Sequence, residues 1–260
     1  MLKQNNLSKI SFKELYKEQK QLSYFKKHKD SSEWDKKAPS FNDYQRHELY
    51  INNFLSYVDF DGCSSLLDFA CGSALLSKKA SVFVDDIVLA DFSPKMLEFA
   101  KLNCPKAQIH QLDFSKINTL PKCDLVFASR CLMVDDLYES LKDLLDKTNM
   151  RFYFTIKKDG IFLSKKIVEV LDEDITPFPN YIYAANILYE LGYDFSLNTI
   201  WAKNPMYDTF DEFKDSVESI YQTLSENEIS KLKKLYFEEG VKNTTDYSWV
   251  LFCVDKTKQD

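Results

Sequence analysis

Short apolar runs alternate with amphipathic segments along most of the chain from residue 64 onward. Runs rich in β-branched and aromatic residues, which are typical of strands, occupy 65–70, 86–91, 107–113, 124–129 and 151–157. The segments between them have apolar residues at the i, i+3, i+4 spacing of a helix, and they occupy 74–83, 94–103 and 135–147. Strands that alternate with helices in this way predict parallel βαβ units, and therefore an α/β fold with a doubly wound sheet.

The pattern continues on both flanks of this alternation. Toward the C-terminus it predicts a helix at 181–192, a strand at 194–203, two amphipathic helices at 210–224 and 225–239, and a last strand at 247–254. Toward the N-terminus it predicts two helices, 8–28 and 40–57, which the polar stretch "DSSEWDKKAP" joins.

The chain length of 260 residues suffices for one large domain with a substantial core. No repeat, low-complexity tract or clear linker divides the sequence. We therefore expect a helical lid region over 1–58 and a sheet domain over 59–260, with a helical insertion at about 205–242.

Charge is unevenly distributed along the chain. The formal net charge is −6, yet residues 1–40 contain ten lysines and only five acidic residues. Such a basic arm predicts either a contact with RNA or a phosphorylated group, or a solvated amphipathic helix. No apolar run reaches the roughly 18 residues that span a bilayer, and the N-terminus lacks the apolar core of a secretory signal. We therefore expect a cytoplasmic protein with no membrane contact.

The residue types that ligate metals are dispersed. The six cysteines form no C-x-x-C pair, several of them lie in apolar runs, and the three histidines are far apart. Because a zinc site needs clustered ligands, we expect no metal. The thiols are then reduced and pack as small hydrophobic side chains.

Three aspartates fall at or just beyond the ends of consecutive predicted strands. Asp68 ends the first strand, Asp91 the second and Asp113 the third. In an open parallel sheet, ligands bind at the carboxyl ends of the strands. A carboxylate after the second strand can accept both ribose hydroxyls of a nucleoside, and one after the third can accept an adenine amino group. The alternative for each aspartate is a simple strand-end or turn residue.

The turn after the first strand, "DFACGSA", has one glycine where dinucleotide-binding turns usually have three. Ala70 and Ala74 occupy the positions on either side of Gly72. A pyrophosphate cradle needs glycines so that backbone amides can close on the phosphates. The turn therefore suits an uncharged ligand tail better than a dinucleotide.

Four segments, in this order and at these spacings, resemble the motifs of class I S-adenosylmethionine-dependent methyltransferases. "LLDFACGSA" is similar to the first motif, with alanines at two glycine positions, and "LADFSPKMLEFAK", "IHQLDF" and "CDLVFAS" resemble the next three. "EWDKKAPSFNDY" is similar to a segment that helps cover the cofactor, and "YSWVLFCV" resembles an antiparallel last strand. The resemblance implies a Rossmann-like, mostly parallel seven-stranded sheet with additional N-terminal helices and a helical insertion before the last strand.

The resemblance also implies S-adenosylmethionine as cofactor and transfer of its methyl group, by in-line displacement, to an oxygen or nitrogen of a small molecule. The cofactor-binding residues that it implies are Trp34, Asp68, Ala70, Cys71, Gly72, Asp91, Phe92, Ser93, Met96, Asp113, Phe114 and Ser129. Phe92 and Phe114 are expected either to flank the adenine or to belong to the core. Trp34 is expected either to cover the cofactor or to pack between helices. No catalytic residue is assigned, because in-line displacement mainly requires alignment of the reactants.

Three residues are candidates for the substrate side of the site. Tyr44 and His47 lie one helical turn apart, and they face either a substrate or solvent on an exposed helix surface. Arg130 follows the fourth strand, where it either holds an anionic substrate group or forms a structural salt bridge.

Other functions remain as alternatives to small-molecule methylation. The stretch "ASRCLM" lacks the Asn/Asp-Pro-Pro-aromatic run of methyltransferases that act on base amines, which disfavours nucleic acid. An RNA or protein substrate stays open only through the basic arm. A nicotinamide-dependent oxidoreductase is disfavoured by the lost glycines and the acid at 68, and a cofactor-binding protein without catalysis is the last alternative.

Overall fold

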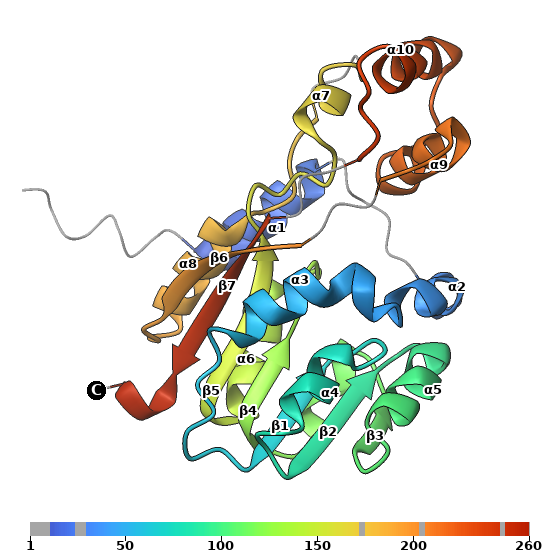
Figure 1. Ribbon diagram of the computed structural model, residues 1–260. Helices are drawn as coiled ribbons and strands as arrows, with labels where there is room; N and C mark the ends of the chain where they lie inside the picture. The colour runs from blue at the N-terminus through green and yellow to red at the C-terminus, as the bar shows by residue number, and fades with distance from the viewer. Residues whose placement is uncertain (1–10, 24–29, 172–174, 203–205, 245–247, 260) are drawn as a thin grey trace, which may run out of the picture.

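A seven-stranded sheet forms the centre of the computed structural model, which describes residues 11–23, 30–171, 175–202, 206–244 and 248–259 (Figure 1). The strands run in the order β3-β2-β1-β4-β5-β7-β6; β1 to β5 are parallel, and β7 is antiparallel to both of its neighbours. Their bounds are β1 Ser65–Phe69, β2 Asp86–Asp91, β3 Gln108–Gln111, β4 Cys123–Ala128, β5 Thr148–Lys157, β6 Ser196–Trp201 and β7 Ser248–Asp255. The expected doubly wound sheet with its antiparallel last strand is confirmed.

Helices cover both faces of the sheet. Because successive strand residues point to opposite faces, Leu67 and Phe69 of β1 pack in one core and Leu66 in the other. No helix among the described residues is long and apolar enough to cross a membrane. The helices are α1 Phe12–Leu22, α2 Ser31–Phe41, α3 Tyr44–Leu55, α4 Leu75–Ala80, α5 Pro94–Asn103, α6 Leu137–Asp146, α7 Lys165–Val168, α8 Tyr181–Glu190, α9 Phe210–Ile220 and α10 Glu226–Phe237, with 3-10 helices η2 Phe114–Thr119 and η3 Lys256–Lys258.

Residues 31–41 form helix α2, so the expectation of a polar connecting stretch was wrong. The Asp30 carboxylate accepts a hydrogen bond from the Glu33 amide at 3.0 Å, and the Glu33 carboxylate accepts one from the Asp30 amide. This capping box starts the helix, although the segment has too few apolar residues to show helical periodicity. The predicted ends that fall at 8–10, 24–28, 203 and 247 lie outside the described residues.

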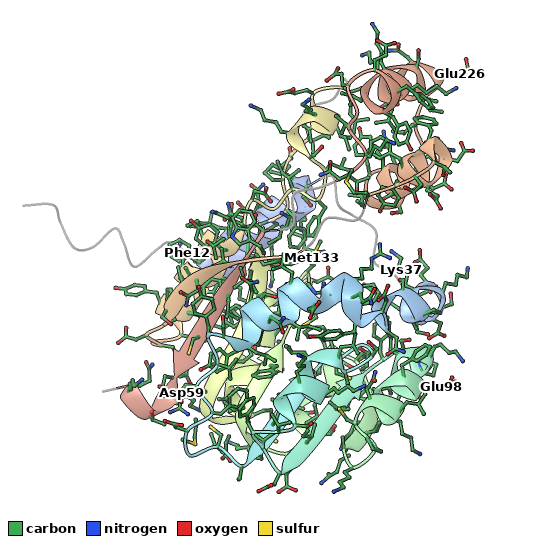
Figure 2. The ribbon with its side chains drawn as sticks, in the orientation of Figure 1. Phe12, Lys37, Asp59, Glu98, Met133 and Glu226 are labelled. Atoms are coloured by element: carbon green, nitrogen blue, oxygen red, sulfur yellow. The ribbon has the colours of Figure 1, made fainter. Side chains whose placement is uncertain are left out.

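Helices α7, α9 and α10 form a separate cap, which lies beyond the end of the sheet where the parallel strands terminate (Figure 1). The cap has its own core, in which Ile167 and Phe213 are fully buried, and Glu226 lies on its outermost helix (Figure 2). Two separate insertions build it. Residues 206–241 supply α9 and α10, as expected, whereas α7 comes from the connection between β5 and β6.

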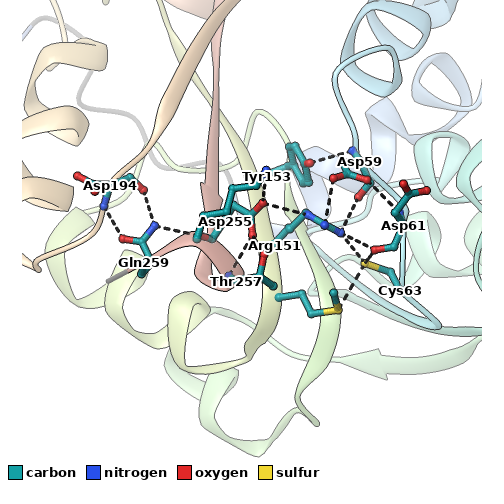
Figure 3. Close-up of polar contacts among 11 residues, drawn as sticks. Asp59, Asp61, Cys63, Arg151, Tyr153, Asp194, Asp255, Thr257 and Gln259 are labelled. Carbon is teal, nitrogen blue, oxygen red and sulfur yellow. Dashed lines mark hydrogen bonds and ion pairs between the residues drawn. The ribbon is translucent and has the colours of Figure 1, made fainter.

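An ion-pair network closes the opposite end of the sheet (Figure 3). The nearly buried Arg151 of β5 pairs with Asp59 at 3.0 Å and with Asp255 at 3.4 Å, and it donates to the Asp61 carbonyl at 2.8 Å. A buried charge is costly unless it is paired and hydrogen-bonded. The network therefore ties the segment before β1 to β5 and to the end of β7.

Asp255 should make the stability of the fold sensitive to acid. Burial raises its pKa, but hydrogen bonds from Thr257 and Lys258 and the charge of Arg151 outweigh burial and lower the pKa to about 2. A lowered pKa stabilises the fold above the ordinary pKa of 3.8, and this contribution is lost as pH falls toward 2. Between pH 5 and pH 2, the unfolding free energy of Asp255→Asn should therefore fall by about 2 kcal/mol less than that of the wild type. Denaturant titrations at the two pH values measure this difference.

The control for this prediction is Asp85→Asn, at an exposed position before β2. It should keep the wild-type dependence on pH. A wild-type dependence in Asp255→Asn would contradict the assignment.

Candidate active site

The loop between β1 and α4 has three left-handed backbone positions in alternation. Ala70, Gly72 and Ala74 have φ values of 54°, 56° and 57°. These are the three positions at which the resemblance implies glycines. The loop keeps the left-handed conformation although the Cβ atoms of Ala70 and Ala74 disfavour it. An L-residue with a Cβ pays roughly 1–2 kcal/mol for this conformation.

Asp91, at the end of β2, connects this loop to the next one. Its carboxylate accepts hydrogen bonds from the Gly72 amide at 2.8 Å and from the Ser93 amide at 2.9 Å. The residue is only 6% exposed, and burial raises its pKa against the effect of those two amides. One carboxylate thus joins the two loops that follow β1 and β2.

Asp68 is buried within β1, beneath the same loop. Its carboxylate accepts a hydrogen bond from the Ser77 hydroxyl at 2.5 Å, and burial raises its pKa to about 7, with a further contribution from Asp91. The pKa of Cys71 is also raised, by burial and by both carboxylates, so this thiol stays protonated. The Asp68 side chain therefore contacts α4 inside the protein.

Helix α2 is attached at the N-terminus of α5. The Asp35 carboxylate accepts hydrogen bonds from the Ser93 hydroxyl at 2.6 Å and from the Lys95 amide at 3.2 Å. The buried Ser93 hydroxyl also caps α5 by accepting from the Met96 amide at 3.1 Å, and the Met96 sulfur lies beneath Gly72. Sequence reasoning missed Asp35, although it directly follows Trp34 in the segment similar to cofactor covers.

Trp34 lies half-buried on α2, next to this attachment point. Its ring packs edge-on against Phe41 at 5.6 Å between centroids, and the ammonium group of Lys37 lies 5.7 Å from the ring centroid. Figure 2 places Lys37 on the same helix, above the carboxyl ends of the strands. The indole therefore packs within α2.

The residues expected around the adenine lie at the ends of β2 and β3, which are neighbours in the sheet. Asp113 is exposed and starts η2, and hydrogen bonds from Ser115 lower its pKa. Phe114 is half-buried with its ring edge-on to Phe69 at 4.7 Å, and Phe92 is half-buried after β2. The structure thus brings these residues to the same edge as Asp91.

On the other side of β1, helix α3 is tied to the ends of β4 and β5. The hydroxyl of the buried Tyr50 lies 2.8 Å from the Ser129 hydroxyl and 2.9 Å from the Thr155 hydroxyl. The Arg130 amide donates to the same Thr155 oxygen at 2.9 Å. Sequence reasoning missed Tyr50 and Thr155, although Tyr50 follows His47 by three residues and so shares its helix face.

Arg130 has a left-handed backbone, with φ of 57°. Its guanidinium lies 4.3 Å from the centroid of the Tyr50 ring and 5.9 Å from that of Phe41. None of the ion pairs found within the described part of the chain includes Arg130, so these residues do not provide the structural salt bridge offered as an alternative.

Tyr44 and His47 are both half-buried, so the interpretation as an exposed helix face was wrong. The His47 ring lies 5.4 Å from Phe41, and its Nε2 is buried without a hydrogen-bond partner among the described residues. Burial and the positive charge of Arg130 lower its pKa to about 4. The imidazole is therefore neutral at neutral pH.

The basic face of α1 is neutralised by the segment that follows β4. Lys13 pairs with Glu139 at 2.6 Å, and Lys17 pairs with Asp136 at 3.0 Å. The buried Tyr16 donates to a backbone carbonyl of the same segment, on which Figure 2 places Met133. Helix α1 is therefore packed against the protein, and these lysines are not a free basic surface.

A sequence model of the family described as "Methyltransferase domain" matches residues 66–148, the span that runs from β1 to the start of β5. It contains the β1–α4 loop, Asp91, Asp113 and Arg130. This span is therefore a methyltransferase domain, and the chain has the fold of solved S-adenosylmethionine-dependent methyltransferases. The match sets the oxidoreductase alternative aside.

Individual relatives of this methyltransferase cover most of its length. An uncharacterized protein of Haemophilus influenzae is 28% identical over 220 residues, which are 81% of this chain and 82% of that protein. A demethylmenaquinone methyltransferase of Leptospira interrogans is 29% identical over 66% of this chain and 71% of its own. The solved magnesium protoporphyrin IX methyltransferase of Synechocystis, with bound S-adenosylhomocysteine, shares the fold with a TM-score of 0.51 and 13% identity, over 94% of this chain and 96% of that one.

The strain of the methyltransferase loop can be measured with two matched substitutions. Ala74 and Ala100 are both fully buried, but Ala100 lies within helix α5, whereas Ala74 has a positive φ. Both changes to glycine remove the same methyl group and add the same chain entropy to the unfolded state. Only Ala74→Gly also relieves a left-handed conformation. We therefore expect Ala74→Gly to lower the unfolding free energy by roughly 1–2 kcal/mol less than Ala100→Gly does.

Chemical denaturation of the two variants beside the wild type gives this difference. Equal losses in the two variants would show that the loop is not strained.

Proposed function

We propose that this enzyme methylates an oxygen or nitrogen atom of a small-molecule acceptor. When bound, S-adenosylmethionine supplies a methyl group on a positively charged sulfur, and transfer breaks that carbon–sulfur bond while the nucleophile forms a new bond to the methyl carbon. The observation that carries the proposal is the Asp91 carboxylate, which is held by the Gly72 and Ser93 amides at the edge where parallel strands end.

The cofactor seat follows from the positions of the side chains. Each carboxylate oxygen of Asp91 accepts one amide and has a further lone pair, so the group can still accept the two ribose hydroxyls. Phe92 and Phe114 then flank the adenine. The Asp113 oxygen that is not bonded to Ser115 accepts a hydrogen bond from the adenine amino group. The loop 70–74, including the Cys71 backbone, lies beside the methionine part of the cofactor.

The remaining predicted cofactor residues have two kinds of role in this proposal. Asp68, Ser93 and Met96 are buried, so they hold the loops in position without touching the cofactor. Trp34 covers the cofactor from α2, and Ser129 lies beside the reacting end. The region 1–58 is accordingly a lid, and 59–260 is the methyltransferase domain with its helical insertion at about 205–242.

The surroundings of the site favour a small acceptor. Helix α3 lies across one face of the sheet and reaches the carboxyl ends of β4 and β5 through Tyr50, and the cap lies beyond that end (Figure 1). The lysines of α1 that would favour RNA are paired with Asp136 and Glu139. The Leptospira relative, by its name, acts on a small molecule, demethylmenaquinone. The protein's main contribution to catalysis is then to align the two reactants and to exclude water.

The ribose assignment is tested by Asp91→Ala. Loss of charge-assisted hydrogen bonds should weaken binding of S-adenosylhomocysteine by about 1.5–3 kcal/mol, measured by calorimetry. Asp86→Ala is the matched control, because Asp86 is an exposed aspartate at the start of the same strand. It should leave the affinity unchanged.

A second pair of ligands separates a ribose contact from damage to the loop. The wild type should bind adenosine more tightly than 2′,3′-dideoxyadenosine, and Asp91→Ala should lose this preference. If the variant kept the preference, Asp91 would not be the ribose ligand.

A further inference from the structure

The acceptor side of the proposed site contains one cation that the described residues do not neutralise. Arg130 lies two residues after the end of β4, and none of the ion pairs among the described residues includes it. The charge is only partly exposed to solvent. A half-buried cation without an anion beside it is costly, so its placement needs a reason.

The backbone and two aromatic rings fix the direction of the Arg130 side chain. Its φ of 57° is strained for a residue with a Cβ, and its amide is held by the Thr155 hydroxyl. The rings of Tyr50 and Phe41 lie 4.3 and 5.9 Å from the guanidinium carbon. Contacts of this kind use the face of the guanidinium and leave its N–H edge available for the two parallel hydrogen bonds that a carboxylate accepts.

His47 gives a second, independent indication of a missing polar partner. Its Nε2 is buried and has no hydrogen bond to a described residue, whereas more than nine in ten buried polar groups have a partner. The ring packs on the same Phe41 that lies beside Arg130. An orphan nitrogen and an unpaired guanidinium thus share one aromatic neighbour.

We infer that Arg130, beside the neutral His47, binds a carboxylate group of the methyl acceptor, so that the acceptor is a small organic acid. This inference rests on the proposed function. It explains why positive charge follows β4, whereas the carboxylates of Asp68 and Asp91 lie on the cofactor side. The cofactor also has a carboxylate, on its methionine part, and the experiment must distinguish these two sources.

The test measures binding of formate and of benzoate, by calorimetry, to the protein saturated with S-adenosylhomocysteine. The wild type should bind at least one of these anions, and Arg130→Met should weaken that binding at least tenfold. Benzamide, which has the same ring without the charge, should bind the two proteins equally. Arg46→Met is the matched control, because Arg46 is an exposed arginine on α3, the helix of His47, and it should change anion binding less than twofold.

Binding of the cofactor product distinguishes the two carboxylates. S-adenosylhomocysteine should bind Arg130→Met and the wild type equally. If the variant instead lost affinity for S-adenosylhomocysteine but not for methylthioadenosine, which lacks the amino-acid part, Arg130 would hold the cofactor and the inference would be wrong.

Two other results are decisive. Anion binding that is absent, or equal in the wild type and Arg130→Met, overturns the inference while leaving the proposed function intact. Failure of the wild type to bind S-adenosylhomocysteine contradicts the proposed function itself. If Arg130→Met does not fold, Arg130→Lys replaces it; this variant keeps the charge but loses the planar fork, and a loss of anion affinity of at least threefold supports the inference.

Discussion

The buried carboxylate of Asp91 is the interaction on which the arrangement of the site depends. It accepts hydrogen bonds from the Gly72 amide of one loop and the Ser93 amide of the next. Neither loop can therefore move without leaving a buried carboxylate unsatisfied. The Ser93 hydroxyl in turn donates to Asp35, which brings helix α2 to the same point. One chain of hydrogen bonds therefore connects the strand end, both loops and the helix that covers them.

The proposed acceptor half of the site has its own set of hydrogen bonds, and it too includes an N-terminal helix. Tyr50 of α3 reaches the hydroxyls of Ser129 and Thr155, which belong to the ends of β4 and β5. Because α2 and α3 are consecutive in the chain, the segment 31–55 is fixed at one end by the cofactor half and at the other by the acceptor half. The two halves are thus held at a set separation by a single helical pair, as alignment of two reactants requires.

The strands and the position of Asp91 could be predicted because their signals are local: an apolar run, a turn and the spacing between them. Other parts depend on contacts between distant residues. Asp35 meets Ser93 across 58 positions and Tyr50 meets Thr155 across 105, and no short window of sequence contains both partners. The inward orientation of His47 was missed for the same reason, since only the sheet beneath α3 makes that face buried.

Charge in the site is divided between the ends of β1 and β2 on one side and the end of β4 on the other. Burial and the negative charge of Asp91 raise the pKa of Asp68, and both carboxylates lie on the side where a positively charged methyl donor is proposed. Arg130 lies after β4, where an anionic acceptor is proposed. Transfer of the methyl group removes the positive charge of the donor, so the attraction on the β1 side is stronger before transfer than after it. In the proposed reaction, this separation of charge orders the two reactants and also weakens the attraction for the spent cofactor.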